Sequence, residues 1–442
     1  MSQSTTFSQR LCPPQSPAEL LSRFAHLDHV VYLYDQHQPV IGCFAEAYAV
    51  IQANTSQYFH AQGINDYHPC APIDFSQYIT AAEVSQKAAH FQGGVMGFVS
   101  YDHAAQQHIE IQSKAQPALF LGVFTSYLVL TAEGWVFHST SAQAAAQFKL
   151  LQQCLQQVPA LQLVLEQPCQ ARWTQQQYQH AFQHVQDYIV AGDCYQINLT
   201  QEFTAKAQGT LLASAEAFWQ LTNAPYAGYL RIGEFELLSC SPELFIEFNP
   251  ERQIITKPIK GTMPRYSDPE RDAQSKQSLK DSEKDRAENV MIVDLLRNDL
   301  SVYAEVGSVK TPKLFAIESF NQVHHMVSDV TATLKAEVSP FEVLMSALPG
   351  GSITGAPKIR AMQIIDELEG APRGAYCGSL GYFNFDGTGA WNILIRSIQK
   401  HHDQVSLWAG GGITIASDCD AEYQECFDKV QAMLKLLNQY VA

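Results

Sequence analysis

Lys260 stands at the end of an apolar strand and directly before a glycine. Residues 253–256 (QIIT) predict the strand, and the sequence PIKGT follows at residues 258–262. A lysine held in this way is a candidate for burial, and burial lowers the pKa of an ammonium group. The neutral amine could then act as a nucleophile. A surface lysine at the end of a hairpin would show the same local pattern.

Two predicted helices each carry a pair of carboxylates three residues apart. The pairs are Asp285 with Glu288, and Glu422 with Glu425. Residues at i and i+3 are neighbours on one helix face, where like charges repel unless a cation lies between them. Four carboxylates on two helices would suit a hard divalent cation such as Mg²⁺. Two solvated helix faces would show the same spacing, and Asp285 could also form a capping box with Ser282.

Two glycine-rich turns and one arginine could hold an anionic substrate. The sequence GGSITGAPK at residues 350–358 leads into a predicted helix and lacks the spacing of a nucleotide-binding P-loop. Its N–H groups could bind an anion or simply brace a site, and AGGGI at residues 409–413 offers similar bare amides. Arg396 lies in a predicted apolar strand, where its guanidinium group needs a partner such as a carboxylate.

The composition limits the kinds of partner that we expect. The chain has 442 residues, is 46% hydrophobic and has a formal net charge of −16. This size favours two or more domains, and the negative charge argues against a nucleic acid or an anionic membrane as partner. No apolar run is long enough to span a membrane, and the N-terminus lacks the apolar core of a signal peptide. The ten scattered cysteines predict reduced thiols, so we expect a cytoplasmic protein.

The order of the predicted elements indicates an α+β architecture, because short connections force strands to pair antiparallel. Helices are expected at residues 174–190, with Thr174 as N-cap and Gly192 as stop, and at 282–296, 357–368 and 421–437. Strands are expected at residues 29–34, 40–49, 94–101, 119–130, 135–138, 195–203, 227–232, 235–240, 244–248, 253–259, near 309, and at 322–334, 377–385, 390–398 and 405–408.

Four long motifs resemble those of the chorismate-utilising enzymes, and they occur in the same order. They are PIKGT at 258–262, KDRAENVMIVDLLRND at 284–299, GGSITGAPK at 350–358 and AGGGI at 409–413. The resemblance covers about residues 174–437 and is looser before them. The family includes the anthranilate, aminodeoxychorismate, isochorismate and salicylate synthases.

The resemblance implies an anthranilate synthase component I-like fold. We therefore expect an α+β structure in which large antiparallel sheets pack as a sandwich, with helices around and between them. Residues 1–167 are expected to form an N-terminal α+β region with a possible amino-acid pocket. Residues 168–442 are expected to form the chorismate-binding catalytic domain.

The resemblance also implies a cofactor and a set of site residues. Mg²⁺ would be held chiefly by Glu288 and Glu425, with Asp285 and Glu422 in support, and the ring carboxylate of chorismate would bridge to it. Lys260, Glu243 and His325 match the catalytic positions, with Glu243 as the general acid for the departing C4 hydroxyl. The expected substrate-binding residues are Gln196, Gly261, Thr262, Tyr376, Arg396, Gly412 and Lys429.

Two positions separate the branches of the family. Isochorismate and salicylate synthases resemble each other in having a lysine general base where this chain has Gln196, and a neutral amide activates water poorly. Anthranilate synthases carry alanine where this chain has Lys260. The resemblance is therefore closest to the component I branch of the aminodeoxychorismate synthases. It implies that the lysine amine attacks C2 of chorismate as the C4 hydroxyl leaves, and that ammonia then enters at C4 and expels the lysine.

The product expected from this branch is 4-amino-4-deoxychorismate, on the way to 4-aminobenzoate and folate. The sequence has no G-x-C-x-G nucleophile motif, so ammonia is expected from a separate glutamine amidotransferase subunit in a heterodimer. Anthranilate synthase component I is the alternative enzyme. A non-catalytic regulatory subunit that binds chorismate or the glutaminase is the alternative of another class. The oligomeric state, the glutaminase interface, the ammonia channel and any tryptophan or other amino acid bound by the N-terminal region are left open.

Overall fold

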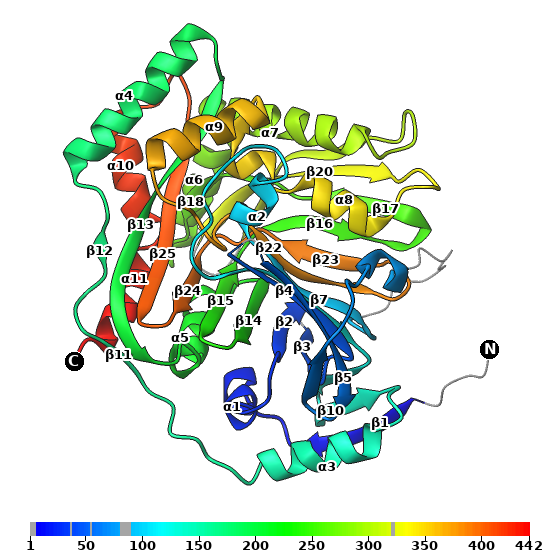
Figure 1. Ribbon diagram of the computed structural model, residues 1–442. Helices are drawn as coiled ribbons and strands as arrows, with labels where there is room; N and C mark the ends of the chain where they lie inside the picture. The colour runs from blue at the N-terminus through cyan, green and yellow to red at the C-terminus, as the bar shows by residue number, and fades with distance from the viewer. Residues whose placement is uncertain (1–5, 36–37, 54, 80–89, 320–322) are drawn as a thin grey trace.

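Two large antiparallel sheets form the framework of the computed structural model, which describes residues 6–35, 38–53, 55–79, 90–319 and 323–442 (Figure 1). The first sheet has 13 strands. Its order is β1 (Phe7–Cys12), β10 (Gly134–Ser139), β9 (Ser126–Thr131), β3 (Gln38–Gly42), β2 (Val31–Asp35), β14 (Tyr226–Ile232), β15 (Phe235–Ser241), β24 (Ser397–His401), β25 (Gln404–Ile413), β13 (Gln196–Gly209) and β11 (Leu163–Leu165), while β12 (Gln170–Ala171) and β21 (Gly355–Ala356) also pair with β13.

The second sheet has 12 strands. Its order is β18 (Ile259–Pro264), β20 (Val323–Thr333), β17 (Gln253–Thr256), β16 (Leu244–Phe248), β23 (Gly389–Asn392), β22 (Ser379–Asn384), β7 (Gly94–Val99), β8 (Pro117–Phe124), β4 (Ala47–Gln52), β5 (Thr55–Gly63) and β6 (Asp66–Pro69), while β19 (Lys310–Ser319) also pairs with β20. Gln322, at the start of the predicted strand 322–334, lies outside the described residues.

The two sheets pack face to face around an apolar core. Leu237 of the first sheet and Phe120 of the second are buried in the same cluster. The rings of Phe98 on β7 and Phe235 on β15 stack with their centroids 5.5 Å apart, which joins the two sheets directly. Burial of such apolar surface is the main force that holds the layers together, at about 25 cal/mol per Å². The predicted α+β sandwich is confirmed.

The helices cover the outer faces of the sandwich. α1, α3, α5 and α11 pack on the first sheet, and α7 and α8 pack on the second. α4, α9 and α10 lie along β13 and β25 (Figure 1). The helices are α1 (Pro17–Arg23), α2 (Tyr101–Ala105), α3 (Ala144–Cys154), α4 (Gln175–Ala191), α5 (Leu212–Thr222), α6 (Pro269–Asp281), α7 (Glu283–Ser301), α8 (Pro340–Ala347), α9 (Lys358–Glu369), α10 (Cys419–Asp428) and α11 (Gln431–Leu437).

Both predicted ends of α4 and the predicted start of α7 are found, because local chemistry sets them, whereas α7 continues to Ser301 beyond its predicted end at residue 296. The side chain of Thr174 accepts from the amide of Gln177 in a capping box, and Gly192 ends α4 with φ 84°. A left-handed φ of this kind favours glycine. The hydroxyl of Ser282 accepts a hydrogen bond from the amide of Asp285 and so begins α7. Each cap satisfies backbone groups that would otherwise lack partners.

Two predicted strands are wrong because each is divided between the two sheets. The run 40–49 forms β3 and β4, and the run 119–130 forms β8 and β9. Phe44 has φ 56° between β3 and β4. Thr125, between β8 and β9, donates a 2.6 Å hydrogen bond to Glu46. The chain crosses from one sheet to the other at these corners, and an apolar run does not reveal such a crossing.

Three further expectations are corrected near the C-terminal end. The closing helix is broken into α10 and α11 around Lys429 and Val430. The strand predicted at 390–398 is also broken, because Arg396 has φ 49° and lies in the connection between β23 and β24. Pro357, which the pattern predicts as the first residue of its helix, is instead the N-cap of α9.

Both sheets contain strands from either side of residue 168. β2 pairs with β14 in the first sheet, and β22 pairs with β7 in the second. The region before residue 168 therefore supports the later strands directly through backbone hydrogen bonds.

The structure shows the state of the cysteines and allows a search for membrane-spanning helices. All ten cysteines are free thiols. Within the described ranges, no helix has the length and apolar character needed to cross a membrane.

Candidate active site

Lys260 lies in an irregular part of β18, at the edge of the second sheet. Ile259 pairs with Val327 and Thr262 pairs with His325, so Lys260 and Gly261 bulge out between them. Gly261 has φ 83°, and a Cβ atom there would approach the carboxylate of Asp285 to 2.9 Å. The glycine thus lets the strand pass close to the start of α7, and the bulge aims the lysine away from the ladder.

The Lys260 side chain is only 17% exposed and is paired with Glu288 on α7. Its Nζ atom lies 3.3 Å from Oε2 of that carboxylate. The side chain is thus mostly enclosed, as its place in the sequence led us to expect, and it is also held by a carboxylate that the local sequence pattern does not reveal.

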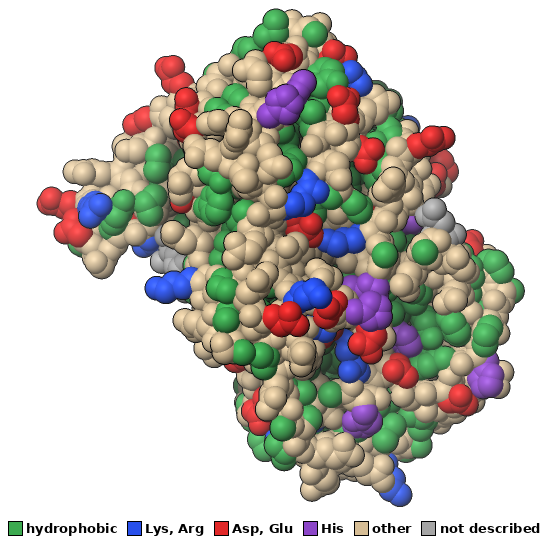
Figure 2. Space-filling model, turned by 60° about the vertical axis from the view of Figure 1, so that its left-hand side comes forward, with side chains coloured by type: hydrophobic (Ala, Val, Ile, Leu, Met, Phe, Trp, Pro, Cys, Tyr) green, Lys and Arg blue, Asp and Glu red, His purple; other side chains and the backbone are tan. Residues whose placement is uncertain are grey.

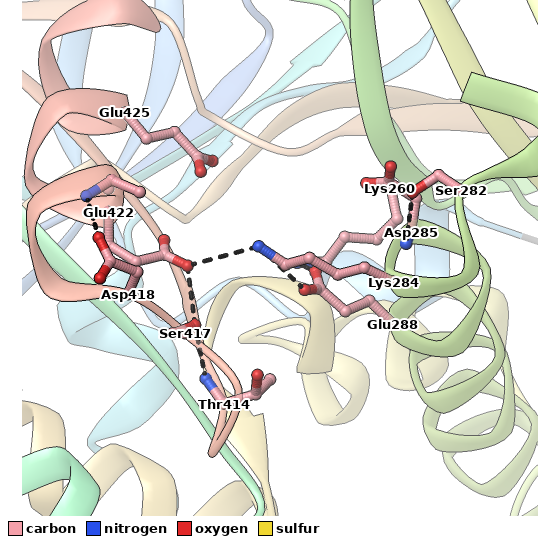
Figure 3. Close-up of polar contacts among 12 residues, drawn as sticks. Lys260, Ser282, Lys284, Asp285, Glu288, Thr414, Ser417, Asp418, Glu422 and Glu425 are labelled. Carbon is pink, nitrogen blue, oxygen red and sulfur yellow. Dashed lines mark hydrogen bonds and ion pairs between the residues drawn. The ribbon is translucent and has the colours of Figure 1, made fainter. Parts of the chain in front are cut away.

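The carboxylates of α7 and α10 face each other across the site (Figure 3). The ammonium group of Lys284 lies between them, 4.0 Å from Glu288 and 3.9 Å from Glu422. Ser417 donates a 2.7 Å hydrogen bond to Glu422. A Cβ atom at Gly411 would come within 2.9 Å of Glu422 and 3.3 Å of Glu425, so this glycine allows both carboxylates to approach β25.

The two carboxylates of α10 differ in electrostatic environment. Burial and the charge of Glu425 raise the pKa of Glu422, although Ser417 acts in the opposite direction. Burial also acts to raise the pKa of Glu425, but the charge and hydrogen bond of Lys429, together with the charges of Lys260 and Lys284, outweigh it and leave that pKa below its usual value. The Nζ atom of Lys429 lies 2.5 Å from Glu425 and donates a 2.8 Å hydrogen bond to the carbonyl of Gly410.

Glu243 is a buried carboxyl in the connection between β15 and β16. Burial raises its pKa to about 7, against the opposing charges of Lys260, Lys429 and Arg396 and a hydrogen bond from the amide of Ile259. The contacts with Ile259 and Lys260 place Glu243 directly beside β18. A carboxyl with this pKa is protonated in part of its population near neutral pH, which suits a general acid.

His325 on β20 is joined to β18 by a side-chain contact. Its Nδ1 atom lies 2.9 Å from the hydroxyl of Thr262. Burial lowers the pKa of His325 to about 4, with Arg396 and His324 adding to the effect, so the ring is neutral near pH 7. His324 instead contacts Ser319 and Asp272 and has a structural explanation.

Gln196 points its amide at Gly412 and Lys260. A Cβ atom on Gly412 would lie 2.8 Å from Nε2 of Gln196 and 3.1 Å from Nζ of Lys260. The Gln196 side chain is buried, and neither of its amide atoms has a hydrogen-bond partner among the described residues. The end of β13 and the glycines of β25 therefore form one wall around the lysine amine.

Arg396 and Tyr376 occupy different surroundings. Arg396 is half-buried, and burial lowers its pKa although Glu243 acts in the opposite direction. Tyr376 is buried in the core, where its ring is nearly parallel to that of Trp408 at 5.7 Å and lies 5.8 Å from the guanidinium group of Arg373. The structure thus brings Arg396 beside Glu243, whereas the contacts found for Tyr376 are with core residues.

Cations and anions are mixed at this site although the whole chain is acidic. Lys260, Lys429 and Arg396 act on Glu243, and Lys284 acts on Glu425. On the face turned forward in Figure 2, basic, acidic and histidine side chains are intermixed near the centre. An anionic substrate would therefore meet cations in spite of the net charge of −16.

Comparison with known proteins identifies the family of this chain. Residues 28–435 match the family described as chorismate binding enzyme. The chain belongs to the chorismate-binding enzymes. Over 353 residues it is 41% identical to aminodeoxychorismate synthase component 1 of Escherichia coli strain K12, covering 79% of this chain and 78% of that protein.

Two further relatives agree with the family and the fold. The chain is 42% identical to aminodeoxychorismate synthase component 1 of Klebsiella aerogenes over 355 residues, which cover 78% of each chain. The solved structure of anthranilate synthase component I from Streptococcus pneumoniae TIGR4 has a TM-score of 0.76 at 26% identity, covering 90% of this chain and 92% of that one.

Two contacts of this chorismate-binding enzyme were not singled out from its sequence. Lys284 lies between the carboxylates of the two helices, and Ser417 donates to Glu422. The spacing of Lys284 and Glu288, at i and i+4, was a usable signal for the first contact. Ser417 had no such signal, because the loop before α10 brings it to the site.

Gly412→Ala should lower the activity of the enzyme while leaving its stability nearly unchanged. The atoms nearest to the new methyl group would be the ends of the side chains of Gln196 and Lys260. We expect a loss of about 10²-fold in kcat/KM, since displacing a reacting group by about 1 Å can cost that much. Steady-state kinetics and thermal melting of the variant test this, and full activity would show that the wall does not position the amine.

Proposed function

We propose that this chain is component I of an aminodeoxychorismate synthase and converts chorismate and ammonia to 4-amino-4-deoxychorismate. The observation that carries this proposal is the position of the Lys260 amine, next to Gln196 and Gly412 and beside the buried acid Glu243. The relatives from Escherichia coli and Klebsiella aerogenes bear the name of this activity. A lysine at this position also argues against the anthranilate branch.

The reaction uses Lys260 as a nucleophile and Glu243 as an acid. The neutral amine attacks C2 of chorismate, the ring double bonds shift, and the C4 hydroxyl takes the proton of Glu243 and leaves as water. Ammonia then attacks C4, the bond between C2 and the lysine nitrogen breaks, and the released amine leaves with its electron pair. The ammonium formed at C4 returns a proton to Glu243. Two allylic displacements thus replace one difficult exchange at a single carbon.

The carboxylates offer the oxygen ligands that Mg²⁺ prefers, but they are not assembled around a common point. Within the described ranges, no three His, Cys, Asp or Glu side chains form a metal-binding group. Glu288 and Glu422 already share a cation, the ammonium group of Lys284, and Glu422 and Glu425 both lie against Gly411. This donor set fits a divalent cation once the lysine has moved.

We therefore assign Mg²⁺ chiefly to Glu288 and Glu425, with Glu422 and Asp285 in support. The carboxylate of Asp285 lies against Gly261, further along β18. When bound, the ion would neutralise and orient the ring carboxylate of chorismate. Lys429 and Arg396 are the cations of the chain itself that would hold the remaining negative charge of the substrate.

Glu288→Gln and Glu425→Gln should each abolish Mg²⁺-dependent activity and weaken Mg²⁺ binding by at least about tenfold. Each change removes one charged oxygen ligand from a hard cation. Isothermal titration with MgCl₂ measures the binding, and Glu283→Gln, an exposed position on the same helix, is the control. Unchanged titration curves for the two variants would rule out these ligands.

The activity is tested by product analysis with ammonium as the nitrogen source. Purified protein, chorismate, Mg²⁺ and ammonium should give a product that aminodeoxychorismate lyase converts to 4-aminobenzoate. Anthranilate as the main product would contradict the proposal and favour the alternative enzyme. The absence of any amination would favour a regulatory subunit instead.

Ammonia would be delivered by a separate glutamine amidotransferase subunit. The words "component 1" in the names of the relatives support a partner of this kind. Glutamine should then replace ammonium only when that subunit is added, and glutamine-dependent activity of this chain alone would contradict the assignment.

A further inference from the structure

Lys284 forms ion pairs with one carboxylate of α7 and one carboxylate of α10. It lies in the first turn of α7, four residues before Glu288, and reaches across to Glu422 on α10 (Figure 3). The Glu422 side chain is only 5% exposed, whereas the Lys284 side chain is 59% exposed. An exposed cation thus pairs with two carboxylates, and the second of them, Glu422, is nearly buried.

The carboxylates need a cation in this position. Glu422 and Glu425 lie close together, since a Cβ atom at Gly411 would come within 2.9 Å of the first carboxylate and 3.3 Å of the second. Glu288 comes toward them from the opposite helix. Without positive charge between the helices, these carboxylates would repel each other.

The contacts of Lys284 are suited to being exchanged. Its distances of 4.0 Å and 3.9 Å to the two carboxylates are those of loose ion pairs rather than of hydrogen bonds. Ion pairs of an exposed lysine contribute little to stability, so exchanging them for another cation costs little. Ser417, by contrast, fixes Glu422 with a hydrogen bond of 2.7 Å.

We propose that Lys284 is a displaceable counter-ion, which holds the carboxylates of α7 and α10 ready in the metal-free protein and must leave when Mg²⁺ binds. This inference rests on the proposed Mg²⁺ site. Lys284 is then a positioning residue that competes with the metal for Glu288 and Glu422. It lowers the affinity for Mg²⁺ while it protects the metal-free site from charge repulsion.

The test is calorimetric titration of the full chain with MgCl₂ in the absence of substrate. Lys284→Met should bind Mg²⁺ about threefold to tenfold more tightly than the wild type, because the competing ammonium group is gone. Lys284→Arg keeps the charge and should stay within about twofold of the wild type. Lys280→Met, which removes an exposed charge at the end of α6, controls for the general electrostatic field.

Thermal melting gives a second measurement on the same proteins. Lys284→Met should melt at a lower temperature than the wild type without metal and should gain more from added Mg²⁺. Equal Mg²⁺ affinity in wild type and Lys284→Met, or an equal gain in Lys280→Met, would overturn the role of Lys284 and leave the metal site standing. If neither wild type nor Lys284→Met binds Mg²⁺, the proposed metal site itself is wrong, and this inference falls with it.

Discussion

Lys260→Ala is expected to lose about 10³-fold or more in the formation of 4-amino-4-deoxychorismate. Removing the nucleophile of a covalent mechanism leaves only the rate that binding and orientation supply. The amine is placed by the bulge of β18 and by Glu288, and an alanine side chain reaches neither the substrate nor this carboxylate. Product formation is measured with saturating ammonium, so that delivery of ammonia does not limit the rate.

A second substitution separates chemistry from structure at the same position. Lys260→Arg keeps a cation beside Glu288 but carries a guanidinium group that does not deprotonate near neutral pH. It should fold like the wild type and be as inactive as the alanine variant. Lys280→Ala, at an exposed position, should keep full activity. Full activity of Lys260→Ala would mean that ammonia reacts with chorismate without a covalent intermediate.

Glu243→Gln should lower the rate by about 10²-fold to 10⁴-fold, the usual contribution of a general acid. An amide of the same shape can accept the hydrogen bond from the amide of Ile259 but cannot protonate the departing hydroxyl. Because the pKa of Glu243 is about 7, the rate of hydroxyl departure in the wild type should fall as pH rises through 7. The residual rate of the variant should lack this alkaline limb, and an unchanged pH profile would assign the acid to another group.

The carboxyl of Glu243 should also make the free energy of unfolding depend on pH. Its pKa is raised from 4.5 in the unfolded chain to about 7 in the folded one. Its contribution is therefore fully present below pH 4.5 and is lost as pH rises through 7, by on the order of 3 kcal/mol. Glu243→Gln should gain stability relative to the wild type between pH 5 and pH 8 in urea unfolding. A difference between the two proteins that does not change with pH would show that the carboxyl is not held neutral.

Local chemistry explains what the sequence predicted about the fold. The caps of α4 at Thr174 and Gly192 depend on residues within one turn, so the sequence contains all of the information. The corner at Phe44 depends on which sheet each strand joins. The break at Val430 depends on distant partners as well, since this residue packs in the cluster of the first sheet, whereas Cys426 packs beside β13. The hydrophobic periodicity of a short stretch of sequence does not reveal which distant residues it packs against.

The residues of the site could be predicted from the sequence, but their surroundings could not. Motif positions predicted that Lys260, Glu288 and Glu425 act together, and the structure brings them from β18, α7 and α10 to one place. The roles of these residues stay predictions. The burial of Glu243 and the place of Lys284 between two helices depend on tertiary packing, and composition and spacing do not reveal them.

Mass spectrometry of the protein with chorismate and Mg²⁺, but without ammonia, tests the central claim most directly. The amine of Lys260 displaces water from chorismate, so the intermediate should accumulate when the second nucleophile is withheld. After digestion, the peptide that contains Lys260 should carry the mass of chorismate less one water, and added ammonium should remove it. An unmodified Lys260 peptide from protein that makes 4-amino-4-deoxychorismate when ammonium is supplied would contradict the account.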